Sequence, residues 1–123
     1  MKALVCGGRD WSDTSAIFSA LDGAREALGV TEIIHGGAPG ADQIAGRWAK
    51  QRDVPCTVYP ANWLVDGKAA GPIRNQRMLD EGKPNMVLAF AGGKGTADMV
   101  RRAVNAALKV YEPTGGWTRR YTP

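Results

Sequence analysis

Short apolar runs alternate with helix-like periodicity along almost the whole chain, and this alternation limits the folds open to it. The pattern predicts short strands at residues 3–6, 31–35, 55–59, 86–90 and 109–112. Between them, apolar side chains recur at helical spacing over residues 13–29, 41–52, 71–82 and 96–108. Strands that alternate with helices form a parallel sheet with right-handed crossovers. The sequence therefore predicts an α/β fold, a three-layer sandwich with a parallel sheet of about five strands.

The chain consists of one long periodic part and a short C-terminal part without periodicity. Its 123 residues suit one domain, and the periodic pattern places that domain at residues 1–112. Residues 113–123 show no periodicity, and we expect a C-terminal tail there. The tail is either a loose end or a segment that crosses to a partner, anchored by Trp117 and Tyr121. Strand order does not follow from the pattern, but by analogy with doubly wound sheets we expect the order 3-2-1-4-5.

The charge balance is only mildly basic. Sixteen Lys and Arg against twelve Asp and Glu give +4, and Arg119 and Arg120 in the acid-free tail leave +2 for the domain. Nucleic-acid binding domains usually carry a clustered basic stripe, so this partner is disfavoured.

No membrane or export segment is recognisable. The apolar run 3–6 is far too short for a signal core, and 86–91 is too short to span a bilayer. We therefore expect a cytoplasmic protein with no membrane partner. Cys6 and Cys56 fall in strand-like runs and are expected in the core as free thiols. With a single His besides, the sequence indicates no metal site and no cofactor.

Half of the sixteen glycines lie in three loops, each of which joins a strand to a helix. They are Gly7 and Gly8, then Gly36, Gly37 and Gly40, and finally Gly92, Gly93 and Gly95. The carboxyl ends of parallel strands share one edge of the sheet, where ligands bind. Glycine allows close approach to backbone N–H groups, and a following helix N-terminus favours phosphate. Three such loops on one edge favour a phosphorylated ligand over the alternative of tight turns alone.

Several polar side chains fall at the same edge. Arg9 suits a phosphate and Asp10 suits ribose hydroxyls, although a local Arg–Asp pair explains both equally well. Arg74, in the first turn of a helix, is the best candidate for an anion-binding cation, because a bound anion would offset the unfavourable helix dipole. Thr96 suits either a helix cap or a phosphate ligand.

Two further residues in this group have a structural reading that we prefer. His35 is the single histidine and closes the second strand; we expect a neutral ring hydrogen-bonded beneath the loop rather than an acid or base. Asp42 lies near a helix start, where a carboxylate caps free N–H groups, and we favour this role over catalysis.

Four ordered motifs, VCGGRDW, HGGAPGAD, GPIRNQRML and FAGGKGTADM, together resemble the SLOG superfamily and, within it, the small YspA-like branch. The resemblance covers residues 2–112. It implies a Rossmann-like fold that binds nucleotides or nucleotide-derived ligands at the glycine edge.

The last motif is similar to the GGxGTxxE signature of the Lonely Guy phosphoribohydrolases, which cleave a base from a nucleoside monophosphate. Gly92, Gly93, Gly95 and Thr96 match, but Met99 stands at the Glu position. Asp98 lies one residue earlier, about 100° around the helix. This resemblance implies an N-glycosidic hydrolase as an alternative function. Its candidate catalytic residues here are Asp98, Asp42, Asp10 and Arg74. Either Arg74 or Arg77 corresponds to that family's catalytic Arg, depending on the alignment.

A third similarity is to the DNA-processing protein A family, which binds single-stranded DNA. Its YPxxN and PxRNR segments are similar to YPANWL and PIRNQRML here, whereas Pro39 replaces a basic residue of its GxARGID segment. The Arg74, Asn75 and Arg77 cluster is retained. This second alternative would use Arg74, Arg77, Lys94, Trp11 and Trp63. We prefer to read Trp63 as packed under its loop.

The leading hypothesis is therefore a sensor, carrier or sequestering protein for a nucleotide-like small molecule. Its expected ligand residues are the eight loop glycines together with Arg9, Asp10, His35, Asp42, Arg74, Asn75 and Thr96. Relatives often pair through helices, so a homodimer is a further expectation.

Overall fold

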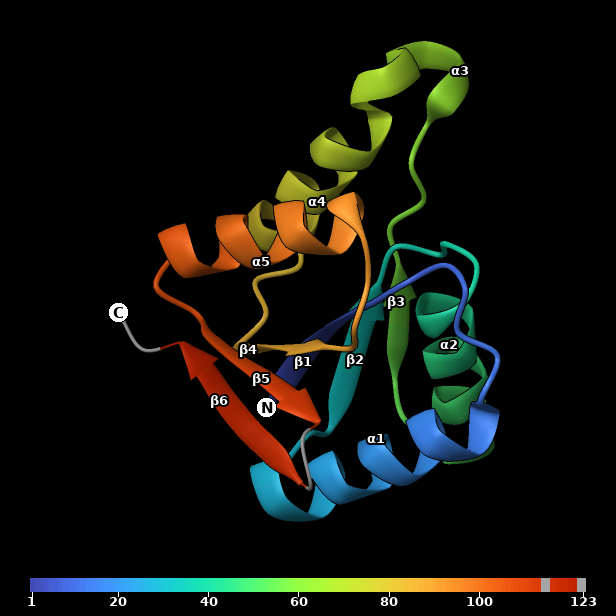
Figure 1. Cartoon of the computed structure of the whole chain (residues 1–123), viewed down its shortest axis with the longest axis vertical. Coiled ribbons are helices and arrows are strands. Elements are labelled where there is room, and N and C mark those ends of the chain that lie inside the picture. The colour runs from blue at the N-terminus through green and yellow to red at the C-terminus, as the bar shows by residue number, and fades with distance from the viewer. Residues whose placement is uncertain (114–115, 122–123) are drawn as a thin grey trace.

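A computed structural model describes the backbone of residues 1–113 and 116–121 (Figure 1). The elements in chain order are β1 (Lys2–Cys6), α1 (Thr14–Leu28), β2 (Glu32–His35), α2 (Ala41–Gln51), β3 (Cys56–Val58), α3 (Trp63–Asp66), the 3-10 turn η1 (Gly67–Ala69), α4 (Ala70–Asp80), β4 (Met86–Ala89), α5 (Lys94–Asn105), β5 (Lys109–Pro113) and β6 (Trp117–Tyr121). Within these ranges no helix is long and apolar enough to cross a membrane.

The described strands form a single sheet in the order β3-β2-β1-β4-β5-β6. The first five are mutually parallel, which confirms both the α/β class and the expected order 3-2-1-4-5. The chain reverses direction relative to its neighbours only at β6, which pairs antiparallel with β5. β1 and β4 thus lie side by side at the centre, where the order of the strands switches direction.

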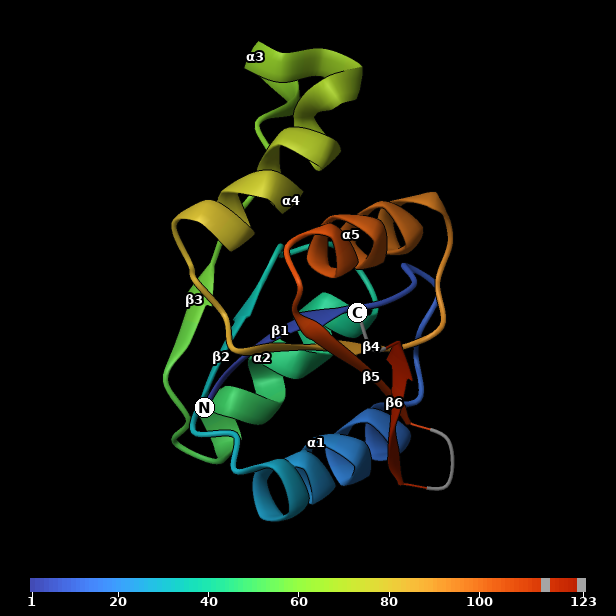
Figure 2. The same ribbon diagram turned by 90° about the vertical axis from the view of Figure 1, so that its left-hand side faces the viewer.

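The two faces of the sheet are covered by different helices (Figure 2). Along β1, successive side chains point to opposite faces, so Ala3 and Val5 pack with α1 and α2 in one core cluster. Leu4 and Cys6 pack with α4 and α5 in the other. This is the predicted three-layer sandwich, and it buries β1 on both faces.

The sixth strand corrects the prediction for the tail. Residues 117–121 are not a loose end but form β6 on the same sheet. The Trp117 indole donates a hydrogen bond to the carbonyl of Ala20 at 2.6 Å and packs edge-on against Phe90. The expected anchor at Trp117 therefore acts within the chain, and the side chain of Tyr121 lies outside the described residues.

Two other expectations were wrong near the opposite edge of the sheet. Cys56 is exposed, because β3 is an edge strand that pairs only with β2 and all three of its residues are exposed. The expected loop 60–71 contains α3, which starts at an Asn62 cap that accepts from the Val65 N–H at 3.2 Å. Trp63 is 53% exposed and is not packed under a loop. Figures 1 and 2 both show α3 projecting beyond the body of the domain.

Candidate functional site

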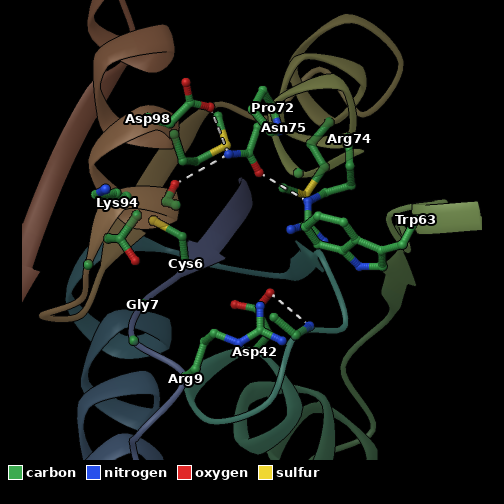
Figure 3. Close-up of a pocket in the computed structure, with 18 residues that line it drawn as sticks. Cys6, Gly7, Arg9, Asp42, Trp63, Pro72, Arg74, Asn75, Lys94 and Asp98 are labelled. Carbon is green, nitrogen blue, oxygen red and sulfur yellow. Dashed lines mark hydrogen bonds between the residues drawn. The ribbon is translucent and has the colours of Figure 1, made fainter. Parts of the chain in front are cut away.

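A cavity of about 330 Å³ opens at the carboxyl ends of β1 and β4, where the strand order switches direction (Figure 3). Ligands of open α/β sheets bind at such a switch point. Of the residues predicted from sequence, those that line the cavity are Gly7, Gly8, Arg9, Asp42, Arg74, Asn75, Gly93, Gly95 and Thr96, and the catalytic candidate Asp98 also lines it. Four segments of chain, far apart in sequence, therefore meet at this edge of the sheet.

The N-terminus of α5 opens into this cavity without a cap. Its N-cap residue is Gly93, and no side chain accepts a hydrogen bond there. The first N–H to find a helical partner is that of Ala97, which donates to Gly93 O at 3.0 Å. In the described part of the chain, the N–H groups of Lys94, Gly95 and Thr96 have no recorded acceptor. No side chain caps the helix, Thr96 included, and Thr96 is among the residues lining the cavity.

The N-terminus of α2 also lacks a side-chain cap, but the loop before it donates hydrogen bonds to a side chain of the same helix. Asp42 Oδ2 accepts hydrogen bonds from the N–H groups of Gly36 at 3.1 Å and Ala38 at 3.3 Å. The Ala41 N–H donates to Gly8 O at 3.1 Å. Asp42 thus ties down the preceding loop rather than its own helix, a variant of the capping role that the sequence favoured.

Burial shapes the electrostatics of Asp42. The residue is only 6% exposed, and this desolvation raises the pKa of its carboxyl to about 6, against the opposing effect of the two N–H groups and of Arg74 and Arg9. Oδ1 accepts no hydrogen bond from the described residues and points away from the loop in Figure 3. The cavity is therefore bordered by a carboxyl group that changes its charge near neutral pH.

His35 lies beneath the same loop and lines neither this cavity nor its neighbour. Its Nδ1 accepts from the Gly37 N–H at 2.9 Å. Burial lowers the pKa of the ring to about 4, and the charge of Arg74 adds to this. The ring is neutral at physiological pH, as the structural reading of the sequence expected.

The cations of the cavity differ in how much of their hydrogen-bonding capacity is already used. Arg74 donates to the carbonyls of Gly36 and Tyr59 and to Asn75 Oδ1, and burial lowers the pKa of its guanidinium. A Cβ on Gly36 would collide with this guanidinium. Arg9 and Lys94, by contrast, have no hydrogen bond or ion pair within the described ranges. They are the cations left open to an anion.

The carboxyl groups on either side of the cavity have pKa values shifted in opposite directions. Burial raises the pKa of Asp98, but hydrogen bonds from Asn75 at 3.0 Å and Arg102 at 2.9 Å outweigh it, and the net pKa lies below the usual range. Arg101 adds a further ion pair. Met99, at the Glu position of the phosphoribohydrolase signature, is buried. Asp98 therefore borders the cavity as an ionised carboxylate whose charge is offset by Arg101 and Arg102.

The remaining candidates lie outside this cavity. Asp10 and Gly92 line a neighbouring groove, whereas Gly36, Gly37 and Gly40 line neither hollow. Arg77 pairs with Glu81 at 2.9 Å and lies over the Tyr59 ring. The Trp11 indole donates to Ala91 O at 2.8 Å. Of the five residues that the single-strand hypothesis invoked, Arg77 and Trp11 are thus engaged within the chain, whereas Lys94 and Trp63 line the cavity.

Among the residues that line the cavity, the predicted ligand set left out a cation and an aromatic side chain, Lys94 and Trp63. Lys94 lies between Gly93 and Gly95, so the glycine-rich loop itself was the sequence signal that pointed to it. Trp63 had no comparable signal, since its exposure depends on α3 standing away from the domain.

The comparisons with known proteins agree with the resemblance read from the motifs. Residues 1–65 match YAcAr, the YspA, cpYpsA-related SLOG family. The Gene 61 protein of Mycobacterium phage D29 is 36% identical over 118 residues, which cover 89% of this chain and 93% of that protein. No solved structure matches the chain.

Proposed function

Since the chain belongs to the YspA, cpYpsA-related SLOG family, we propose that it binds a nucleotide or nucleotide-derived, phosphorylated ligand in the cavity beside β1 and β4. The observation that carries this proposal is the uncapped N-terminus of α5, whose first N–H groups open into the cavity next to Lys94. Helix N-termini of this kind bind phosphate through N–H donors and the helix dipole. The domain would act as a sensor, carrier or sequestering protein.

The remainder of the cavity suits the rest of a nucleotide. Arg9 is available for a second phosphate oxygen, and the exposed Trp63 offers an aromatic face to a base. A volume of about 330 Å³ is at the lower end of small-molecule sites.

Calorimetry with nucleoside mono- and diphosphates tests this proposal. Lys94→Gln should weaken binding by about tenfold or more, because hydrogen bonds to charged groups contribute roughly 1.5–3 kcal/mol. Lys50→Gln, at the exposed far end of α2, is the matched control and should leave affinity unchanged. No binding of any nucleotide at millimolar concentration, and no nucleotide released on heat denaturation, would contradict the proposal.

A second candidate function is hydrolysis of an N-glycosidic bond, and the cavity-facing carboxyl of Asp42 is the observation that favours it. In this reaction a water oxygen bonds to the sugar C1′ while Oδ1 of Asp42 accepts the water proton. The C1′–N bond breaks, its electron pair stays on the base nitrogen, and that nitrogen takes up a proton. Asp98 suits this task less well, because three neighbouring side chains already bind its carboxylate.

Free base released from nucleoside monophosphates would reveal this activity. We expect Asp42→Asn to abolish release and Asp98→Asn to retain it, with the rate rising as pH passes about 6. The reverse pattern would assign the chemistry to Asp98. No release from any substrate would leave binding as the function of the cavity.

The expectation of a homodimer stays a prediction, as does a cytoplasmic location. Leu64 and Val65 on α3 are the most exposed large apolar side chains among the described residues, and they support an interface there. Sedimentation equilibrium of the wild type and of a Leu64→Ser, Val65→Ser variant tests it. A monomeric wild type would contradict it.

A further inference from the structure

A second hollow adjoins the cavity described above and has no part in the proposed function so far. It is an open groove of about 630 Å³ lined by residues 8–13 and 91–93. The cavity and the groove share three residues, namely Gly8, Arg9 and Gly93. One ligand that extends past these residues would therefore occupy both hollows.

The ridge between the two hollows consists of backbone. Gly8 N donates to Ala91 O at 2.9 Å, and a Cβ on Gly8 would lie 2.9 Å from that oxygen and 3.2 Å from Gly92 Cα. A Cβ on Gly92 would lie 2.7 Å from Gly8 N. Only glycine fits at these two positions, since real Cβ contacts are longer. At Gly8 and Gly92 the crossing therefore carries no side chain, and Arg9 supplies the side chain at the shared border.

The chemistry of the groove differs from that of the cavity. Arg9 is its single cation, and it lies on the shared border. The groove is also lined by Asp10, Ser12 and Asp13, which can accept hydrogen bonds. Asp13 is used as the cap of α1, accepting from Ala16 N at 3.0 Å. Asp10 has no hydrogen bond or ion pair with the described residues. Such a surface repels phosphate and attracts hydroxyl groups.

We propose that the ligand is a nucleoside diphosphate carrying a sugar on its terminal phosphate, bound across both hollows. The nucleoside occupies the cavity, the diphosphate crosses the glycine ridge beside Arg9 and Lys94, and the sugar lies in the groove. Asp10 accepts hydrogen bonds from the sugar hydroxyls. This inference rests on the proposed function, because the phosphate contact at α5 fixes the direction of the ligand.

The test compares each nucleoside diphosphate with its matched nucleoside diphosphate sugar by calorimetry, across the four common bases. For the preferred base we expect the sugar conjugate to bind about tenfold more tightly than the diphosphate. Asp10→Asn should abolish this difference and leave the diphosphate affinity unchanged or slightly raised, because a negative charge has been removed. Asp53→Asn, a matched change at an exposed site after α2, should preserve the difference.

The possible failures are distinguishable. Equal affinities for diphosphate and sugar conjugate in the wild-type protein would overturn the two-hollow ligand and leave the proposed function intact. If the affinity difference between diphosphate and sugar conjugate persisted in Asp10→Asn, the sugar would not bind in the groove, and the inference would likewise be overturned. Absence of binding by every nucleotide would overturn both proposals.

Discussion

Two glycine-rich loops of this protein are similar in sequence but differ in whether a side chain of the protein accepts hydrogen bonds from their N–H groups. Both the loop before α2 and the loop before α5 follow a central strand and lead into a helix without a side-chain cap. In the first, the carboxylate of Asp42 accepts the N–H groups of Gly36 and Ala38. In the second, no side chain folds back onto the loop, and the N–H groups of the first helical turn, those of Lys94, Gly95 and Thr96, donate to no group in the described chain.

The difference lies in one residue and its burial. A buried carboxylate supplies the first loop with the anion that the second loop leaves to a ligand. Glycine content alone therefore does not distinguish a loop that is complete within the fold from one that is open. What distinguishes them is whether an acidic side chain in the first helical turn folds back onto the loop. α5 has no acidic residue in its first turn.

The largest effect that tests this comparison is expected at Gly40. Its backbone has φ 80° and ψ −126°, and a Cβ would collide with the carbonyl of Gly8. Gly40→Ala should therefore reduce the free energy of unfolding by about 3 kcal/mol or more. Urea unfolding measures this. A loss below about 1 kcal/mol would show that the closed loop is as adaptable as the open one.

The next largest effect is a pH dependence that the wild-type protein conceals. The folded pKa of Asp42, about 6, lies above its ordinary 3.8, so its contribution to stability is lost as pH rises through 6. The folded pKa of His35, about 4, lies below its ordinary 6.5, so its contribution is lost as pH falls towards 4. Each amounts to about 3 kcal/mol, and over the same window they oppose each other.

The Asp42→Asn substitution should remove the contribution of Asp42 and leave only the pH dependence that comes from His35. Between pH 4 and 6.5 the wild-type free energy of unfolding should change little, whereas that of the variant should rise by about 3 kcal/mol. Urea titrations at several pH values measure both curves, with the exposed change Glu26→Gln as control. Parallel curves for wild type and Asp42→Asn would mean that Asp42 does not titrate in this window.

The sequence was sufficient for the architecture because the relevant signals are local. Each apolar run was long enough to mark a strand, and each glycine loop marked a strand's carboxyl end. The cavity therefore lies where those loops predicted it. Local signals do not report packing between distant segments. Trp117 finds the Ala20 carbonyl and the Phe90 ring only after β5 has joined the sheet, so β6 was not predictable.

The same limit applies to individual side chains of the site. Arg74 was a reasonable anion-binding cation from its helix position, but Gly36 approaches it from another segment and its carbonyl takes one of the guanidinium donors. Asp98 and Asp42 were both catalytic candidates from the sequence, which preferred a capping role for Asp42. Only their neighbours, arginines for one and a buried loop for the other, separate their pKa values. Exposure of Cys56 likewise follows from the edge position of β3.

A smaller effect is expected at Thr96, which lines the cavity and whose side chain does not cap α5. Thr96→Val should change the free energy of unfolding by less than about 0.5 kcal/mol and weaken nucleotide binding by roughly fivefold, the value of one hydrogen bond. Calorimetry on the variant and on Thr57→Val, an exposed change in β3, measures this. If Thr96→Val were strongly destabilising instead, the hydroxyl would be serving the fold and the α5 loop would be closed as well.

The smallest effect completes the contrast with Gly40. Gly95 lies in the first turn of α5, and a Cβ there has no neighbouring atom within 4 Å. Because alanine favours helix more than glycine does, Gly95→Ala should leave stability unchanged or raise it by up to about 1 kcal/mol. The same urea series that measures Gly40→Ala decides this. A cost at Gly95 close to that at Gly40 would mean that both loops are constrained by the fold, and the open N-terminus of α5 would then lose its significance as a ligand site.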